Sequence, residues 1–122
     1  MAKILLIDDD EMTLIFMRKM LEDSGFPVVA TADGPHGIEL FKEHHPQLVL
    51  LDIGLPGMSG LQVLRELRSL DPEAQVVIIS GYKSDVTVRQ ALDSGAHEFI
   101  EKPVDARILL EKVRRFLSDS SL

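Results

Sequence analysis

Short runs of consecutive apolar residues recur along the chain and predict buried β-strands. Three of these runs are residues 4–7 (ILLI), 48–51 (LVLL) and 76–79 (VVII), and shorter or weaker ones are residues 99–100 and 27–31. Continuous apolar runs, as opposed to alternating ones, are typical of parallel strands that are covered on both faces. The pattern therefore predicts a parallel sheet buried between two layers.

Segments with helical spacing of apolar residues lie between these runs. They are residues 11–23, 37–44, 60–70, 86–92 and 106–117. In the first segment Met12, Phe16 and Met20 share one face, which we expect to point into the core. The alternation of strands and helices with short connections predicts an α/β fold, in which a doubly wound, five-stranded parallel sheet carries helices on both faces.

Composition narrows the domain organisation and the class of function. The 122 residues suit a single domain over residues 1–122, with an ordered core at about residues 3–117 and a polar tail at 118–122. The net charge of −7 argues against direct binding of nucleic acid, and the lack of cysteine excludes disulfides and thiolate metal sites. No apolar run approaches the ~20 residues that span a bilayer, so we expect no membrane insertion and a cytoplasmic location.

Polar side chains follow four of the predicted strands at the points where those strands end. In chain order they are Asp8, Asp9, Asp10, Asp52, Ser80 and Lys102. The carboxyl ends of parallel strands meet at one edge of an open sheet, where α/β proteins bind ligands. Two carboxylates ~4 Å apart repel by roughly 4 kcal/mol at an effective dielectric constant of about 20, and one lysine cannot neutralise three of them. A hard divalent cation such as Mg²⁺ can, because it prefers oxygen ligands.

This set of groups suits phosphoryl transfer to an aspartate. A carboxylate can act as a nucleophile and form an aspartyl phosphate, and the transfer depends chiefly on positioning and charge neutralisation. Asp52 is the expected nucleophile because it alone ends the central strand. We expect Asp8 and Asp9 to hold the metal, Lys102 to meet the phosphoryl oxygens as a point charge, and Ser80 to hydrogen-bond one of them.

Each of these residues also has an ordinary structural explanation when it is taken alone. An acidic run at the start of a helix is stabilised by the helix dipole, an aspartate can cap a loop, and Ser80-Gly81 is a common turn. The joint pattern, with one group after each of four strands, favours a functional site.

The motifs LLIDDD, LVLLDIGLPGMSG, VVIISG and FIEKPVD resemble those of a response-regulator receiver domain from two-component signalling. The resemblance covers residues 3–117 and implies a flavodoxin-like, three-layer fold with strand order 2-1-3-4-5. It implies that Asp52 is the phosphoacceptor, that Asp8, Asp9, Asp52 and the backbone carbonyl of Gly54 bind Mg²⁺, and that Lys102 is the essential lysine.

The resemblance also implies a switch and a set of partners. Ser80 and Phe99 match the pair of switch residues, although the family more often has tyrosine at the second position. The bond between Lys102 and Pro103 is often cis in the family. Phosphorylation by a sensor histidine kinase or a histidine phosphotransfer protein would shift the face formed by the fourth helix, fifth strand and fifth helix. That face would control a downstream effector or output domain and could support a phosphorylation-dependent dimer.

Two further positions bear on how long the phosphoryl group lasts. In the family, the residues two places after the phosphoacceptor and two places after the switch hydroxyl flank the path of the attacking water. These positions are Gly54 and Tyr82. We expect the ring of Tyr82 to slow hydrolysis. Apart from its own phosphorylation and slow dephosphorylation, a receiver is not expected to act as an enzyme.

Three alternatives remain open at the level of sequence. A haloacid-dehalogenase-like phosphatase would use Asp8 as nucleophile, but the hydroxyl residue that family places two positions after Asp10 falls on Met12. A flavin-binding flavodoxin would need aromatic residues, and the chain has one tyrosine and no tryptophan. A degenerate receiver would serve only as an interaction module, which the complete set of site residues argues against.

Overall fold

The computed structural model describes residues 3–55, 57–81 and 83–119. The strands are β1 (Ile4–Ile7), β2 (Val28–Thr31), β3 (Leu48–Leu51), β4 (Gln75–Ser80) and β5 (Glu98–Glu101). The helices are α1 (Glu11–Asp23), α2 (Gly34–His44), α3 (Gly60–Leu70), α4 (Asp85–Asp93) and α5 (Ala106–Asp119). None of the described helices has the length and apolar character that crossing a bilayer requires.

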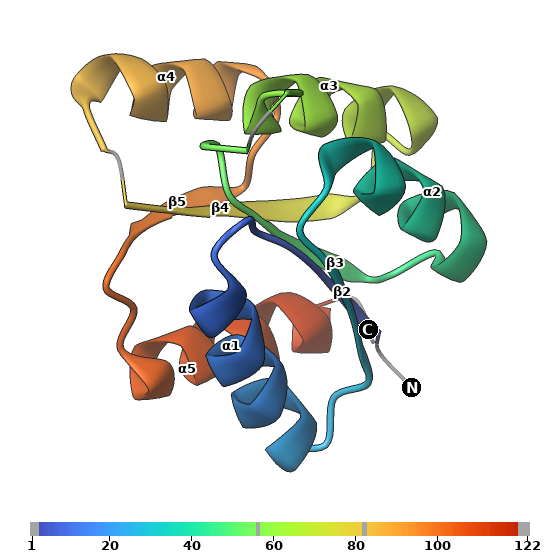
Figure 1. Cartoon of the computed structure of the whole chain (residues 1–122), viewed down its shortest axis with the longest axis vertical. Helices are drawn as coiled ribbons and strands as arrows, with labels where there is room; N and C mark the ends of the chain where they lie inside the picture. The colour runs from blue at the N-terminus through green and yellow to red at the C-terminus, as the bar shows by residue number, and fades with distance from the viewer. Residues whose placement is uncertain (1–2, 56, 82, 120–122) are drawn as a thin grey trace.

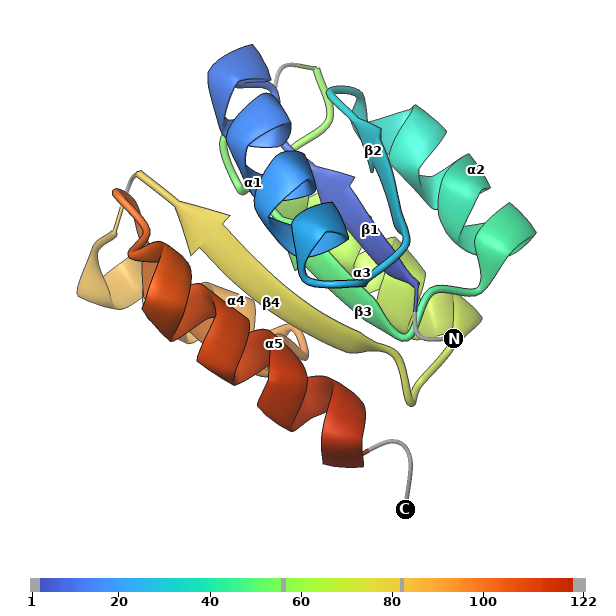
Figure 2. The same ribbon diagram turned by 90° about the horizontal axis from the view of Figure 1, so that it is seen from below.

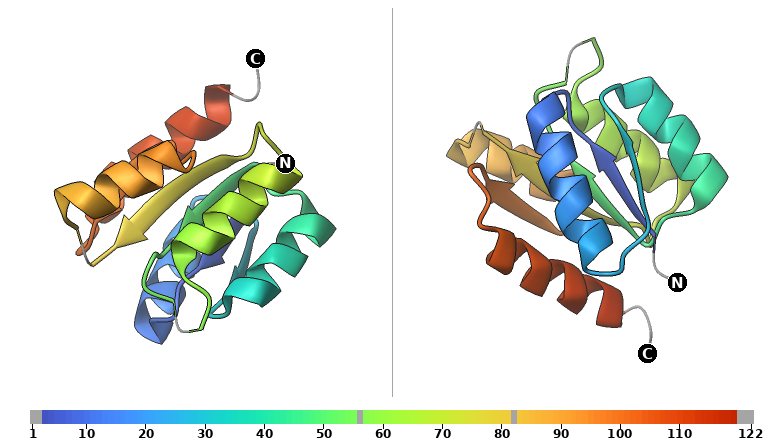
Figure 3. Two further views of the ribbon diagram at one scale, coloured as in Figure 1. Left: turned by 90° about the horizontal axis from the view of Figure 1, so that it is seen from above. Right: turned by 60° about the horizontal axis from the view of Figure 1, so that its bottom comes forward.

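The five strands form one parallel sheet in the order β2-β1-β3-β4-β5, which confirms the predicted topology. Helices α2, α3 and α4 cover one face of the sheet, and α1 and α5 cover the other (Figure 1). Figure 2 shows α1 and α5 lying side by side across their face, and Figure 3 shows both faces in turn. The molecule is therefore a three-layer sandwich with β1 and β3 at its centre.

Alternate residues of the central strands feed two separate cores. Leu5 and Ile7 of β1 pack with α2, α3 and α4, whereas Ile4 and Leu6 pack with α1 and α5. All four of these β1 residues are at most 2% exposed, since a covered parallel strand buries both of its faces. The continuous apolar runs in the sequence reflect this double burial.

Helix α1 differs from the prediction in the face that it buries. Met12 is 71% exposed and Phe16 is 52% exposed, whereas Met17 is 4% exposed and Leu21 is fully buried. The prediction was therefore wrong for Met12 and Phe16, whereas Met17, which was also expected in the core, is buried and Met20 packs against the core while partly buried. Apolar residues occupy more than one face of this helix, so their spacing alone does not reveal which face meets the sheet.

Helices α2, α4 and α5 extend past their predicted bounds, α4 by one residue at each end. Helix α2 begins at Gly34, earlier than the predicted residue 37, because Asp33 caps it by accepting a hydrogen bond from the amide of His36 (2.8 Å) and Pro35 fits the first turn. Helix α5 continues to Asp119, past the predicted end at residue 117. Asp105 caps α5 as its position suggests, since the amides of the first turn donate to its side chain.

Candidate functional site

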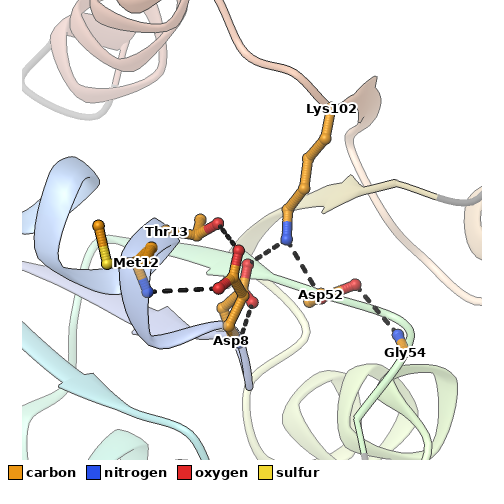
Figure 4. A network of polar contacts seen from close by, with 7 residues as sticks. Asp8, Met12, Thr13, Asp52, Gly54 and Lys102 are labelled. Atoms are coloured by element: carbon orange, nitrogen blue, oxygen red, sulfur yellow. Dashed lines mark hydrogen bonds and ion pairs between the residues drawn. The ribbon is translucent and has the colours of Figure 1, made fainter.

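The candidate site lies at the carboxyl edge of the sheet, where the residues after β1, β3 and β5 meet. Asp8 follows β1 and Asp52 follows β3, and these two strands are hydrogen-bonded neighbours in register. Lys102 follows β5 and reaches across, so that its Nζ lies 2.7 Å from Oδ2 of Asp8 and 3.4 Å from Oδ2 of Asp52 (Figure 4). Chain segments far apart in sequence thus deliver two carboxylates to one ammonium group.

Backbone amides hold the other oxygen of each carboxylate. The amide of Asp10 donates to Oδ1 of Asp8 (2.9 Å), and the amide of Gly54 donates to Oδ1 of Asp52 (3.0 Å). Asp8 and Asp52 are 6% and 7% exposed. Because both oxygens of each group have partners, the two side chains are fixed in orientation before any ligand binds.

The loop between β3 and α3 folds back onto the backbone of Asp52. The amide of Gly60 donates to the carbonyl of Ile53 (2.9 Å), and a Cβ at Gly60 would lie 2.2 Å from the backbone oxygen of Asp52. Glycine is required there because any side chain would collide with this backbone. The small residues after Asp52 therefore let the chain turn tightly beside it.

The donor set fits a hard divalent cation. Carboxylate oxygens of Asp8, Asp9 and Asp52 lie within 4.8 Å of one another, and oxygen-only ligands suit Mg²⁺. Burial raises the pKa of Asp8 above its usual range, and the contacts from Lys102 and the Asp10 amide offset this only in part. Ionised Asp8 is thus under-compensated by the residues that the structure describes.

Lys102 carries the opposing charge of the cluster. Burial by itself would lower its pKa, but the neighbouring Asp8 and Asp52 carboxylates outweigh burial and raise that pKa. The ammonium group is therefore held in its charged form. Within the described part of the chain, the ion pairs of Asp8 and Asp52 involve this lysine alone.

Of the two predicted switch residues, Ser80 lies at the same edge of the sheet, and Phe99 lies within β5. Ser80 ends β4 and is 2% exposed, and its carbonyl accepts a hydrogen bond from the amide of Lys102 (2.9 Å). Phe99 of β5 is half-buried and packs against the core beneath α3 and α4. The bond between Lys102 and Pro103 is cis. Tyr82 lies outside the described residues, so its expected effect on hydrolysis stays a prediction.

One member of the acidic run does not join the cluster. Asp10 caps α1, with Oδ1 accepting from the amide of Met12 (3.3 Å) and Oδ2 from the hydroxyl of Thr13 (2.6 Å). An aspartate directly before a helical segment is a recognised N-cap signal, and Thr13 three residues later offers a hydroxyl donor for it. The sequence therefore contained a signal for this cap. The histidines lie away from the site as expected, and His36, His45 and His97 are exposed.

Comparison with known proteins assigns the family. The family model of the response regulator receiver domain matches residues 4–114. The chain belongs to this family. This receiver domain is 35% identical over 117 residues to the chemotaxis protein CheY of Bacillus subtilis, and the alignment covers 95% of this chain and 98% of that protein. It is 33% identical to the transcriptional regulatory protein AfsQ1 of Streptomyces coelicolor, where it covers 96% of this chain but 52% of that protein.

Solved structures share the same architecture. A CheY-like receiver domain from Methanospirillum hungatei matches with a TM-score of 0.95 and 32% identity, covering 99% of this chain and 97% of that one. A chain of the CheX–CheY–BeF₃–Mg²⁺ complex from Borrelia burgdorferi matches with a TM-score of 0.89 and 30% identity, covering 95% and 89%. These matches confirm the flavodoxin-like fold and the place of this receiver domain in two-component signalling.

Proposed function

We propose that this receiver domain is a phosphoacceptor switch in which Asp52 receives a phosphoryl group. The observation that carries the proposal is the Asp52 carboxylate itself. It ends the central strand at the ligand-binding edge, with one oxygen on the Gly54 amide and the other near Lys102. Both contacts fix the direction in which the carboxylate meets an incoming phosphorus atom. Such positioning supplies most of what phosphoryl transfer asks of a protein.

The reaction balances as a displacement at phosphorus. An oxygen of the Asp52 carboxylate bonds to phosphorus, and the bond from phosphorus to the donor breaks. With a phosphohistidine donor the imidazole nitrogen keeps the electron pair, and with an acyl phosphate the carboxylate leaves. Lys102 neutralises part of the charge on the phosphoryl oxygens, and the Ser80 hydroxyl donates a hydrogen bond to one of them after transfer.

Mg²⁺ is the cofactor that we propose for this step. Asp8, Asp9, Asp52 and the backbone carbonyl of Gly54 would hold it, and it would supply positive charge that lowers the repulsion between the carboxylates and the phosphoryl group. The spacing of the three carboxylates and the raised pKa of Asp8, which burial causes, support this assignment. The similar chain from Borrelia burgdorferi belongs to a complex that contains Mg²⁺ and BeF₃.

The proposed donor is the phosphohistidine of a sensor histidine kinase or of a histidine phosphotransfer protein, and the proposed output is a surface change on α4, β5 and α5. Helix α4 suits this role because Ala91 is its one buried residue among those described. Ser80 ends β4 and Phe99 belongs to the neighbouring β5, so we propose that movement of the Ser80 hydroxyl toward the phosphoryl group is accompanied by a change of the Phe99 ring. The output acts on an effector or output domain. We propose no catalysis beyond the domain's own phosphorylation and dephosphorylation.

The test is labelling by a small phosphodonor. Wild-type protein with acetyl phosphate and Mg²⁺ should gain one phosphoryl group by intact mass, and Asp52→Asn should gain none. Asp33→Asn is the matched control, because Asp33 caps α2 and asparagine caps as well as aspartate. It should label like wild type.

Mapping of the modified residue distinguishes an Asp52 nucleophile from the Asp8 nucleophile of the phosphatase alternative. Borohydride reduction of the acyl phosphate followed by peptide mapping should mark Asp52. A mark on Asp8 would overturn the proposal in favour of a phosphatase-like nucleophile, and full labelling of Asp52→Asn would do the same.

A further inference from the structure

The three consecutive aspartates after β1 divide into two groups with different surroundings. Asp8 and Asp9 have carboxylate oxygens within 4.8 Å of an oxygen of Asp52, and among the described residues Asp10 is not a member of that group. Instead, both oxygens of Asp10 accept hydrogen bonds from the first turn of α1, from the amide of Met12 and the hydroxyl of Thr13. Asp10 therefore faces the helix and not the cluster.

The backbone of Asp10 connects this cap to the site. Its amide donates to Oδ1 of Asp8 (2.9 Å), while Oδ2 of Asp8 lies 2.7 Å from Nζ of Lys102. One residue thus joins the first turn of α1 through its side chain and a proposed metal ligand through its main chain. The chain of contacts runs from Thr13 to the side chain of Asp10, and from the Asp10 amide through Asp8 and Lys102 to Asp52. Figure 4 shows the contacts that join Asp8, Lys102 and Asp52.

The cap restrains the conformation of Asp10 and hence the direction of its amide. Asp10 has φ −85° and ψ 107°, the extended conformation of an N-cap residue, and its carbonyl accepts from the amide of Leu14 (3.0 Å). If the side chain of Asp10 no longer accepts hydrogen bonds from Met12 and Thr13, the junction between β1 and α1 gains rotational freedom. The amide of Asp10 then no longer points in a fixed direction at Oδ1 of Asp8, because Asp8 and Asp10 belong to the same three-residue segment.

We propose that Asp10 is a positioning residue, which acts through the α1 cap and its own amide to orient Asp8 for the cation and does not bind the cation itself. This inference rests on the proposed function, since it concerns the same Mg²⁺ site. The role needs an acceptor at the cap and not a negative charge. That difference between acceptor and charge makes the proposal testable.

The test compares two substitutions at position 10. Mg²⁺ is titrated into the whole chain, and binding is monitored by NMR of the amides of Asp8 and Asp9. Asp10→Asn keeps the cap and removes the charge, since asparagine is as good an N-cap as aspartate. It should bind Mg²⁺ within about twofold of wild type. Asp10→Ala removes the cap and should bind about three- to fivefold more weakly, because binding must then order the freed junction between β1 and α1.

Two more variants separate positioning from a loss of stability. Asp33→Ala removes the cap of α2, whose aspartate accepts from the amide of His36, and should lower stability about as much as Asp10→Ala without weakening Mg²⁺ binding. Thr13→Val keeps the Asp10 carboxylate and removes the hydroxyl that binds it, so it should weaken Mg²⁺ binding in the same direction as Asp10→Ala. The backbone amide at position 10 should exchange its hydrogen faster in Asp10→Ala than in wild type, and at the wild-type rate in Asp10→Asn.

The outcomes distinguish this inference from the proposed function. If wild type binds no Mg²⁺ and accepts no phosphoryl group, the proposed function fails. If wild type does both but Asp10→Asn binds as weakly as Asp10→Ala, the charge of Asp10 acts on the cation and the positioning role is wrong. Equal Mg²⁺ affinity in wild type and Asp10→Ala would also overturn it.

Discussion

The two edges of the sheet differ in the groups that their polar side chains contact. At the amino edge, Arg68 of α3 donates to the carbonyls of Pro72 (2.8 Å) and Gly95 (2.7 Å), and Gln75 donates to the carbonyl of Phe116 (3.0 Å). These contacts join loops and helix ends, and the acceptors are neutral backbone groups. The chain itself supplies these partners, although Nε of Arg68 is a buried donor without a hydrogen-bond partner in the described part of the chain.

At the carboxyl edge the balance is different. Asp8 and Asp52 are almost fully buried, and Asp9 lies beside them. Within the described residues, Lys102 is the basic side chain that forms ion pairs with Asp8 and Asp52. The pKa of Asp8 is raised because burial outweighs its favourable contacts. The contacts of the amino edge thus end on neutral backbone groups, whereas the carboxyl edge keeps an electrostatic demand that an external cation and a phosphoryl group can meet.

The largest expected effect is at the carboxyl edge, in Lys102→Met. The side chains of Asp8 and Asp52 are each 8% exposed, so removal of their ammonium partner leaves two buried carboxylates uncompensated. We expect the metal-free protein to lose about 3 kcal/mol in its free energy of unfolding. Saturating Mg²⁺ should restore most of this, because the cation replaces the missing charge. Chemical denaturation with chelator and with Mg²⁺ measures both effects. A loss that Mg²⁺ does not recover would show that the cation does not compensate Asp8 and Asp52.

The matched variant at the amino edge is Arg68→Met, with a smaller expected effect. It removes the donor of the exposed Pro72 carbonyl and of the partly buried Gly95 carbonyl, and it should lower the free energy of unfolding by about 1 kcal/mol. Mg²⁺ should not recover this loss, and Mg²⁺ affinity should equal that of wild type. Recovery by Mg²⁺ here would mean that the two edges are not independent.

A pH series on Asp8→Asn tests the electrostatic demand itself. A carboxyl whose pKa is raised by folding favours its neutral form in the folded state, so its contribution to stability is present below the unfolded pKa and is lost as pH rises through the folded pKa. Metal-free wild type should therefore be less stable than Asp8→Asn at neutral pH, and the two should converge as pH falls below the ordinary aspartate pKa. Denaturation in chelator across this range measures the difference. A wild type that is the more stable of the two at neutral pH would show that Lys102 fully compensates Asp8.

The sequence predicted the sheet and the location of the site because both depend on patterns that run along the chain. A covered parallel strand must be apolar on both faces, so runs such as residues 48–51 stand out. Strand order followed from the family resemblance. Once the strands are placed, the residues after them must meet at one edge, which brought Asp8, Asp52 and Lys102 together before any distance was known.

The features that escaped prediction depend on the direction of a side chain. Asp8 and Asp10 are the same residue type in one acidic run, and only the position of α1 decides that one enters the cluster and the other caps the helix. The exposed face of α1 escaped for a related reason, since Met12 and Met17 look alike in sequence but lie on different sides of the helix. Periodicity fixes the relative positions of residues on a helix but not which face packs on the sheet.

The electrostatic demand of the carboxyl edge is measured by the melting temperatures of wild type and Asp9→Ala, each with chelator and with saturating Mg²⁺. Asp9 is exposed, so its removal creates no cavity, and any change reports the charge balance of the cluster. Without metal, Asp9→Ala should melt higher than wild type because one repelling carboxylate is gone. With Mg²⁺ the order should reverse, since wild type binds the cation more tightly and is stabilised more. An Asp9→Ala protein that melts lower than wild type in chelator, or that gains as much from Mg²⁺ as wild type does, would contradict the account.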